Sequence, residues 1–353
     1  MTQVLDRQDA VLGFVARWVE GLARAADRVR VLALEVGDTT DLPPNVDWVE
    51  LGRRGAVGRY LRYRRAVRGS VLEGFDGLLT HMVPRYSVVA APWARRAGIS
   101  HYLWYTHKGV DQRLLRAIEV VDGVFTASEE SMRVDTPKKI VTGHGIDAAH
   151  FDVPRTEDGA GPLRLLSVGR LTPAKDPLTV VEALSLLRQG GVDVRLRWAG
   201  GALARGDDEY AGMVRRTIEA KSLTDAVDFV GSVPYPDVPA LYRDCDLFVN
   251  ASRTGSVDKV VLEAMAASRP FVSCNEAIPP LLGGALPPTA DPEDHAFRAG
   301  DPESLADAVR RWIGLDAGAR AERSAALARM VRSEHDVDAL MARLVRTMEG
   351  GAS

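Results

Sequence analysis

A cation-rich loop follows an apolar run within the segment SVGRLTPAKDPLTVVEAL (167–184). Arg170 and Lys175 lie in that loop, Asp176 is a good helix N-cap, and Pro177 suits a first helical turn. Cations beside the positive end of a helix dipole repel that end and each other. Two phosphate groups would resolve this conflict through charge-assisted hydrogen bonds and backbone N–H groups. The plainer interpretation, a pair of solvated loop charges, stays open on this pattern alone.

The second chemical feature is a carboxylate, Glu263, in TGSVDKVVLEAMA (254–266), a stretch that predicts a helix apolar on nearly every face. Such a helix is normally buried, and a buried carboxylate needs a partner. One interpretation is an ion pair with Lys259 on a solvated stripe. The other has Glu263 accepting hydrogen bonds from two vicinal hydroxyls, as on a ribose. We expect Ser256 to cap this helix and Asp258 to complement its dipole.

Weaker candidates open predicted helices or follow predicted strands. Gly13 would let the first helix start close to a ligand, and Gly200 would let a strand end approach one, although a plain turn also explains Gly200. The turn that contains Val233 has backbone groups that could contact a nucleobase. His107 ends a predicted strand, but a lone histidine is more often structural.

The elements that must position these residues alternate between short apolar runs and helical patterns. The expected strands are 29–36, 46–51, 77–82, 101–107, 123–128 and 139–145, then 163–169, 194–200, 226–231, 246–250 and 270–274. Such alternation predicts an α/β protein with parallel sheets and right-handed crossovers. Two blocks of this kind predict two doubly wound domains, with ligands at the carboxyl ends of the strands and a site in the cleft between the domains. The expected divisions are an N-terminal domain at 1–150, a linker at 151–162, a C-terminal domain at 163–333, and a last helix at 334–353 that could pack back on the N-terminal domain.

The first strand of the N-terminal domain is expected to be missing or truncated. Only Met1 to Leu5 precede the first predicted helix, whereas a central strand normally has about 5–6 residues. Burying such a strand would contribute about 10 kcal/mol, comparable with the stability of a whole domain. We therefore hypothesise that the true start lies upstream of Met1. Equal melting temperature and activity with and without upstream codons would contradict this.

Composition narrows the class of protein. With 353 residues, 46% hydrophobic and 26% charged, the chain fits a two-domain soluble protein. A formal net charge of −3 argues against nucleic-acid binding. Cys245 and Cys274 are too few for a zinc site or a disulfide framework and are expected to be buried thiols, and no metal is expected. No run of 18 apolar residues and no secretory signal occur, which predicts a cytoplasmic location.

An arginine run, GRRGAVGRYLRYRRAVR (52–68), holds seven arginines and no acid. Most such runs are solvated helix faces. The alternative is contact of Arg53–Arg68 with an anionic surface, either a membrane leaflet or an acidic acceptor. The protein would then lie peripherally at the inner face of the membrane.

Taken together, five motifs resemble the retaining glycosyltransferases of family 4 in their order and spacing. They are SVGRLTPAKDP, WAGG, DFVGSVP, LYRDCDLFVNAS and VVLEAMAASRPFV, all within 163–275, and the likeness is weaker in the N-terminal half. The resemblance implies a GT-B fold and a UDP- or GDP-linked sugar donor held mainly by the C-terminal domain. It also implies a glycan, lipid-linked or small-molecule acceptor on the N-terminal domain, and no cofactor or obligatory metal.

The resemblance also implies roles for individual residues. Arg170 and Lys175 would hold the diphosphate and stabilise charge that grows on the leaving phosphate. Glu263 would bind the ribose, His107 would lie near the transferred sugar, and Val233 would meet the base through its backbone. The family mechanism favours front-face displacement with retention, in which the donor phosphate takes the acceptor proton.

One position departs from the family pattern. A second Glu usually stands eight residues before the one matched by Glu263, and here that position is Gly255. Ser256, Asp258 or backbone N–H groups would then contact the donor sugar. The Ala- and Arg-rich composition indicates a GC-rich bacterial genome, which leaves cell-envelope or exopolysaccharide assembly and natural-product glycosylation open. Two other classes remain: a sugar-nucleotide epimerase or hydrolase, and a non-catalytic sugar-nucleotide binder.

Overall fold

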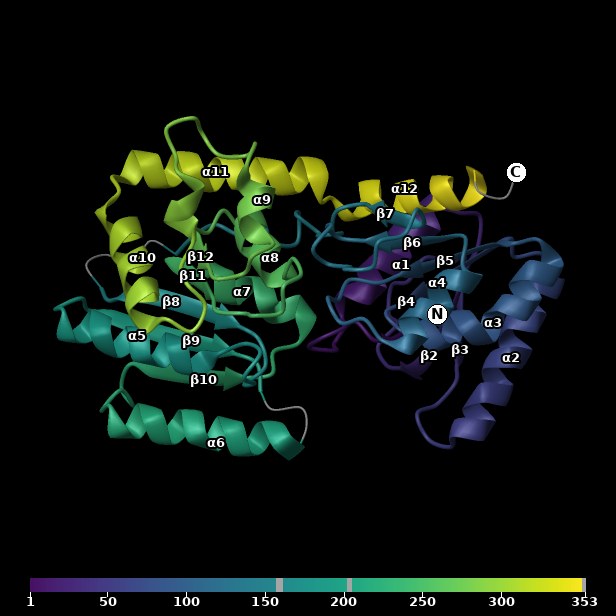
Figure 1. Ribbon diagram of the computed structural model, residues 1–353, viewed down its shortest axis with the longest axis horizontal. Helices are drawn as coiled ribbons and strands as arrows, with labels where there is room; N and C mark the ends of the chain where they lie inside the picture. The colour runs from purple at the N-terminus through teal and green to yellow at the C-terminus, as the bar shows by residue number, and fades with distance from the viewer. Residues whose placement is uncertain (157–160, 202–204, 351–353) are drawn as a thin grey trace. The chain divides into compact units, whose positions relative to one another are not determined.

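The computed structural model describes residues 1–156, 161–201 and 205–350. These residues form two compact α/β units, each containing parallel strands and helices (Figure 1). The first unit comprises Met1–Gly145, Pro234–Pro236 and the chain from His335 onward, and the second comprises Ile146–Val233 and Asp237–Glu334. Part of the expected linker, 157–160, and the end of the expected last segment, 351–353, lie outside the described residues.

The first unit is a doubly wound α/β fold. Its elements are β1 (Thr2–Leu5), α1 (Phe14–Ala25), β2 (Val29–Val36), β3 (Val46–Glu50), α2 (Ala56–Leu72), β4 (Gly77–His81), α3 (Pro84–Ala97), β5 (Ser100–Trp104), α4 (Gln112–Val120), β6 (Gly123–Thr126), β7 (Lys139–Val141) and α12 (Val337–Gly350). The strands form two parallel sheets of order β1-β2-β3 and β4-β5-β6-β7. Met1 joins them, because its backbone N donates to Leu79 O and its O accepts from His81 N, both at 2.8 Å.

The first strand, expected to be missing or truncated, is present as the four-residue β1. It pairs in parallel with β2, with Thr2 opposite Ala33 and Val4 opposite Glu35. Thr2, Val4 and Leu5 are buried, because β1 lies between β2 and β4. A strand with neighbours on both sides can be short and still bury its side chains.

The last helix, α12, belongs to the first unit and packs against α1. Leu340 and Met341 of α12 join the same buried cluster as Trp18 of α1. At the edge of this contact Arg17 Nη2 lies 2.7 Å from Asp338 Oδ2. The amphipathic pattern of the last segment is therefore satisfied by the apolar face of the first helix.

The second unit holds one parallel sheet of order β10-β9-β8-β11-β12. Its elements are β8 (Leu163–Val168), α5 (Pro177–Gln189), β9 (Val194–Ala199), α6 (Arg205–Ala220), β10 (Val227–Gly231), α7 (Val238–Arg243), β11 (Leu247–Asn250), α8 (Lys259–Ala266), β12 (Phe271–Ser273), α9 (Ile278–Leu282), α10 (Pro302–Gly314) and α11 (Ala317–Glu334), with the 3₁₀ helix η2 (Pro292–His295). The 3₁₀ helix η1 (Tyr235–Asp237) begins in the segment Pro234–Pro236 of the first unit. The chain winds outward from β8 to β10 and then returns to β11 on the other side of β8. This reversal is a topological switch point, where open α/β sheets bind ligands.

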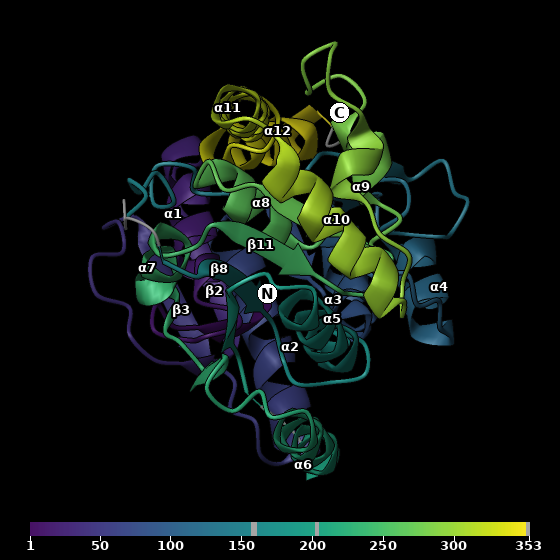
Figure 2. The ribbon, with the colours of Figure 1, turned by 90° about the vertical axis from the view of Figure 1, so that its left-hand side faces the viewer.

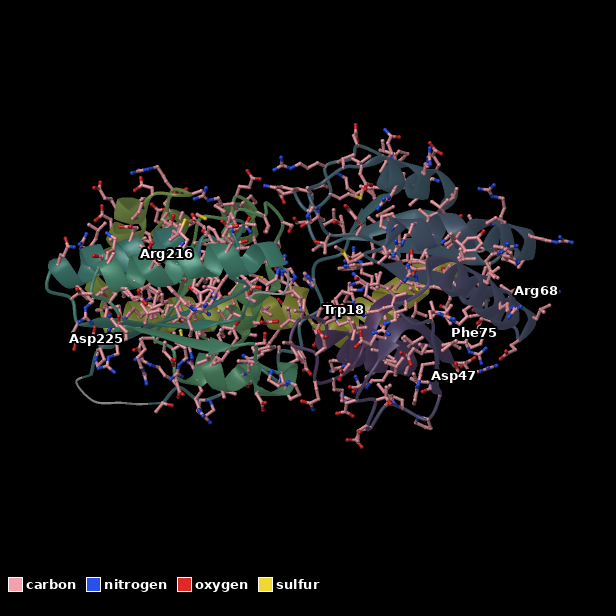
Figure 3. All side chains as sticks on the ribbon, turned by 90° about the horizontal axis from the view of Figure 1, so that it is seen from below. Trp18, Asp47, Arg68, Phe75, Arg216 and Asp225 are labelled. Atoms are coloured by element: carbon pink, nitrogen blue, oxygen red, sulfur yellow. The ribbon has the colours of Figure 1, made fainter. Side chains whose placement is uncertain are left out.

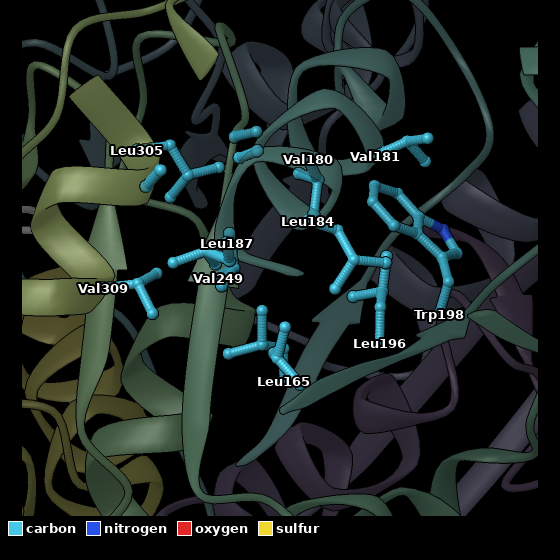
Figure 4. Close-up of a cluster of buried hydrophobic side chains, with 14 of the residues drawn as sticks. Leu165, Val180, Val181, Leu184, Leu187, Leu196, Trp198, Val249, Leu305 and Val309 are labelled. Carbon is cyan, nitrogen blue, oxygen red and sulfur yellow. The ribbon is translucent and has the colours of Figure 1, made fainter. Parts of the chain in front are cut away.

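The core of the second unit fixes the position of that switch point. Helices α5 and α10 lie side by side over the sheet (Figure 2). Figure 4 shows Leu184 of α5, Leu196 of β9 and Leu305 of α10 among the side chains of this core. Each is at most 1% exposed, and burial of one such side chain contributes about 1.5–3 kcal/mol.

Along 1–156, 161–201 and 205–350, no helix is both long and apolar enough to cross a bilayer.

Candidate functional site

Two loops meet at the switch point of the second unit. The β8 loop, residues 169–176, follows β8, and the β11 loop, residues 251–258, follows β11. Arg253 N of the β11 loop donates to Ala174 O of the β8 loop at 2.9 Å. Lys175 Nζ donates to Ser252 Oγ at 3.1 Å. The cationic loop and the loop ahead of Glu263, recognised separately in the sequence, therefore form one site.

The β8 loop enters α5 through Asp176. The predicted N-cap is confirmed, because the Asp176 side chain accepts hydrogen bonds from the backbone N and the Oγ1 of Thr179, the latter at 2.6 Å. Asp176 has a φ of 48°, which costs a non-glycine residue about 1–2 kcal/mol. Its ion pair with Arg253 offsets that cost. Asp176 thereby ties both loops to the start of the helix.

Arg170 differs from the other charged residues of the site. It is exposed, and it makes no side-chain hydrogen bond or ion pair with any residue that the structure describes. Its guanidinium group can therefore offer all of its N–H donors to an anion. Lys175, by contrast, is held by protein groups.

The glycines at the ends of β8 and β9 pack against each other. Gly200 has a φ of 123°, and a Cβ there would lie 2.2 Å from Gly169 O. The same carbonyl accepts a hydrogen bond from Trp198 Nε1 at 2.8 Å. The close approach predicted for Gly200 is thus made to the protein's own backbone, and it brings the carboxyl ends of both strands together.

Glu263 lies in a buried environment on α8. Its side chain is 6% exposed and that of Lys259 is 19% exposed, with Lys259 Nζ 3.9 Å from Glu263 Oε1. The Tyr242 hydroxyl shares its one proton between Glu263 Oε2 at 3.2 Å and Val260 O at 3.0 Å. Burial raises the pKa of Glu263 and lowers that of Lys259 to about 8. The interpretation of this pair as part of a solvated stripe is therefore wrong.

The start of α8 differs from the expected cap. Asp258, not Ser256, occupies the N-cap position, and its side chain makes no capping hydrogen bond. Ser256 instead accepts a hydrogen bond at its backbone O from Asn275 Nδ2 at 2.7 Å. The prediction for Ser256 fails because the helix begins at Lys259, which places Asp258 at the N-cap. Asp258 makes no capping hydrogen bond because its carboxylate is engaged elsewhere, which local sequence spacing does not reveal.

The Asp258 carboxylate is directed at Lys175 and at two asparagines. Lys175 Nζ lies 2.8 Å from Oδ1, while Asn250 Nδ2 and Asn275 Nδ2 lie 3.3 and 3.2 Å from Oδ2. Burial alone would raise the pKa of Asp258, but the charge of Lys175 and the hydrogen bonds from Lys175, Ser252 and Asn250 outweigh it and hold the pKa below its usual value. Asp258 is therefore a buried anion with a fixed cation.

Gly255 lies in the β11 loop with a φ of 64°. Glycine adopts this left-handed conformation without penalty, whereas a side chain there costs about 1–2 kcal/mol. The left-handed backbone of the β11 loop at this position therefore favours glycine.

The remaining predicted residues lie outside this loop pair. His107 is exposed and follows β5 by three residues, since that strand ends at Trp104 and not at 107 as predicted, and its Nδ1 accepts from Gly109 N at 2.9 Å. A Cβ on Gly13 would lie 2.5 Å from Tyr235 Cβ, so protein atoms fill the space beside Gly13. Val233 is half-buried after β10.

Several site residues were not found from the sequence. Asn250 ends the predicted strand 246–250 and Ser252 follows it, so the strand-end signal that singled out Arg170 could have found both. Tyr242 gave no signal, because its link to Glu263 depends on how α7 meets α8. Within the described residues, no cluster of three His, Cys, Asp or Glu side chains could hold a metal ion.

The two doubly wound units and their parallel sheets define a GT-B fold. Comparison with solved structures agrees: Anabaena HepE, crystallised with UDP, has a TM-score of 0.77 at 18% identity over 99% of both chains. Residues 162–314 match the family model described as Glycosyl transferases group 1. A glycogen synthase from Mycobacterium tuberculosis is 31% identical over 303 residues, 78% of this chain and 67% of that protein. The chain belongs to the group 1 glycosyl transferases.

A bacterial relative is longer than this chain. The amylovoran biosynthesis glycosyltransferase AmsK of Erwinia amylovora is 26% identical over 257 residues. The match covers 69% of this chain and 57% of AmsK. The chain thus spans less than two thirds of that relative's length.

Proposed function

We propose that this chain is a metal-independent, retaining glycosyltransferase of family 4, which moves a sugar from a nucleotide-sugar donor to an acceptor hydroxyl. The observation that carries the proposal is the pair Arg170 and Lys175 on one loop at the switch point, with Glu263 on the helix that follows the opposing loop. The description of the similar Anabaena structures as complexes with UDP and UDP-glucose supports a UDP-linked donor. A GDP-linked donor is the alternative.

Each site residue has a proposed role that follows from its charge and its burial. Arg170 and Lys175 bind the diphosphate and stabilise charge that develops on the leaving phosphate. Glu263 accepts hydrogen bonds from the ribose hydroxyls, with Tyr242 and Lys259 holding its carboxylate. The leaving phosphate takes the acceptor proton on the front face, which retains the configuration at the sugar. In this scheme Val233 meets the base through its backbone, His107 contacts the transferred sugar, and Gly13 contacts the donor.

The proposed acceptor is a growing cell-envelope glycan or a lipid-linked saccharide. The name of the Erwinia relative, which refers to amylovoran biosynthesis, supports this choice. A natural-product acceptor is the alternative. The proposed location is the cytoplasm, at the inner face of the membrane.

A basic, partly apolar surface on α2 and on Arg54, just ahead of that helix, favours contact with an anionic bilayer. Arg54, Arg65 and Arg68 are exposed and form no ion pair with any described residue, and Arg68 lies at the outer surface of the first unit (Figure 3). Val57 and Leu61 of the same helix are 74% and 45% exposed. Cations beside exposed apolar side chains suit a surface of anionic lipid headgroups.

Vesicle sedimentation tests this contact. The protein should sediment with phosphatidylglycerol vesicles and not with phosphatidylcholine vesicles. The triple variant R54E/R65E/R68E should lose sedimentation, while the matched variant R195E/R215E/R216E, which changes three exposed arginines of the second unit, should retain it. Equal loss in both variants would show a general charge effect and contradict a docking helix.

Turnover distinguishes the candidate functions. The protein is incubated with UDP-, GDP- and dTDP-sugars, and release of nucleoside diphosphate is measured with and without saccharide or lipid-linked acceptors. Release that depends on acceptor supports the transferase. Release without acceptor supports a hydrolase or epimerase, and binding without release supports a non-catalytic binder.

A further inference from the structure

The proposed donor site contains more negative charge than a diphosphate site needs. Lys175 lies beside Asp258, and Arg253 pairs with Asp176. Asp176 is buried and Asp258 is largely buried, at 8% and 11% side-chain exposure. A buried carboxylate near a phosphate site repels the ligand unless a cation compensates it. The role of these two carboxylates is therefore to fix the cations with which they pair.

The partners of Lys175 define a direction for its ammonium group. An ammonium group has three N–H donors. Among the described residues, two of these are used, by Ser252 Oγ at 3.1 Å and by Asp258 Oδ1 at 2.8 Å. One donor remains for a ligand, and both acceptors belong to the β11 loop.

Asp258 itself is held from both sides. Thr254 Oγ1 donates to its Oδ1 at 3.3 Å, and Asn250 and Asn275 donate to its Oδ2. Asn250 is in turn fixed by Ser273, whose Oγ donates to Asn250 Oδ1 at 2.9 Å. The carboxylate therefore cannot turn toward a ligand without losing several hydrogen bonds, which makes it a poor direct contact for a sugar hydroxyl.

We infer that Asp258 is a positioning residue, which fixes the Lys175 ammonium group so that its third N–H meets the donor diphosphate, at the expense of ground-state affinity. The inference rests on the proposed function. It replaces the expectation that Asp258 contacts the transferred sugar. Its negative charge weakens diphosphate binding, while the fixed ammonium group stabilises charge as the phosphate leaves.

The test measures binding and turnover in Asp258→Asn. Asn keeps the shape and an acceptor oxygen but removes the charge that fixes Lys175. We expect UDP or GDP, measured by calorimetry, to bind about tenfold more tightly because one negative charge is gone. We also expect kcat to fall about tenfold because the ammonium group is no longer fixed. Asp258→Glu restores the charge and should recover part of kcat.

Asp225→Asn is the matched control. It makes the same change in charge in the second unit, at a side chain that is 67% exposed and pairs with Arg188 outside the two loops. It should leave both nucleotide binding and kcat close to those of the wild type, because solvent screens its charge and Lys175 keeps both partners. Equal falls of kcat in D258N and D225N would overturn the positioning role.

The remaining outcomes of these experiments also test the inference. If D258N weakens binding and turnover together, or changes neither, Asp258 is structural or idle and the inference is wrong. If D258N does not fold, Ser252→Ala removes the other partner of Lys175, and an unchanged kcat there would overturn the inference. If the wild type binds neither UDP nor GDP and consumes neither UDP-glucose nor GDP-mannose, the proposed function itself fails.

Discussion

The carboxyl edges of the two units carry different side chains, although both belong to doubly wound parallel folds. In the second unit this edge holds charged groups such as Lys175 and Asp258, 2.8 Å apart. In the first unit it holds an aromatic cluster, formed by Trp18, Trp104 and His144. The Trp18 ring centroid lies 4.8 Å from that of Trp104 and 5.7 Å from that of His144.

The aromatic edge of the first unit and the charged edge of the second unit suit different tasks, one the stability of the fold and the other the stabilisation of a developing charge. Packed rings gain from contact area and exclude water, so the aromatic cluster stabilises the first unit. Fixed ion pairs contribute little net stability once desolvation is counted. They do hold charged donors in defined positions, which is what stabilisation of a developing anion requires. Substitutions at the two edges should therefore affect different measurements.

The largest expected effect is on the stability of the first unit. Trp18→Ala should lower the free energy of unfolding by about 3–5 kcal/mol, because it empties a packed site and removes the hydrogen bond to Gly145 O. Chemical denaturation measures this, with Trp18→Phe as the milder control. UDP affinity of the folded variant should stay unchanged, since the second unit carries the loops. A loss below about 1 kcal/mol would show that the cluster is not a stabilising core.

The next effect is on turnover at the charged edge. Arg170→Ala and Lys175→Ala should each raise the transition-state barrier by about 2–4 kcal/mol, seen as a fall in kcat/KM. Arg170→Ala should change stability by less than about 0.5 kcal/mol, because exposed Arg170 has no partner among the described residues. Lys175→Ala should also destabilise, since it leaves Asp258 buried without its cation. Full activity of Arg170→Ala would remove the main support for the diphosphate site.

A third expectation concerns how the stability of the protein depends on pH. Burial lowers the pKa of His335 from 6.5 to about 4, and its Nδ1 accepts from His144 N at 3.0 Å. The unfolded chain therefore takes up a proton at a higher pH than the folded one. Above about pH 6.5 neutral His335 makes its full contribution to the free energy of unfolding. That contribution is lost as the pH falls toward 4, by about 3 kcal/mol in all. Denaturation at several pH values should show a shallower loss for His335→Gln, and an identical slope would contradict this account.

The smallest effect is expected at Glu263. Glu263→Gln removes a charged acceptor from the proposed ribose site, and we expect UDP or GDP affinity to fall by about 1–2 kcal/mol, with a smaller change in kcat. Tyr242→Phe is the companion variant, because it removes only the hydroxyl that orients the carboxylate. Unchanged nucleotide affinity in Glu263→Gln would indicate that the carboxylate serves only Lys259 and Tyr242.

Much of the fold followed from local pattern. The strands of the second unit and the Asp176 N-cap were predicted correctly, because apolar periodicity and capping depend on neighbours in sequence. Strands 101–107 and 139–145 were predicted too long: the strands end at Trp104 and Val141, and Gly143, with a φ of 77°, turns the chain away from the second of them. β1 was missed because a four-residue strand shows no periodicity and is recognisable only by its neighbours.

The sequence by itself determined the alternation of strands and helices, the position of Arg170 and Lys175 after a strand, and the apolar surroundings of Glu263. These depend on residues within a few positions of one another. Only the tertiary structure decided that Asp258 serves Lys175, 83 residues away in the chain. It also decided that Tyr242 meets Glu263. Pairing of β8 with β11 brings the two loops together, and a sheet register is a long-range choice that no local pattern contains.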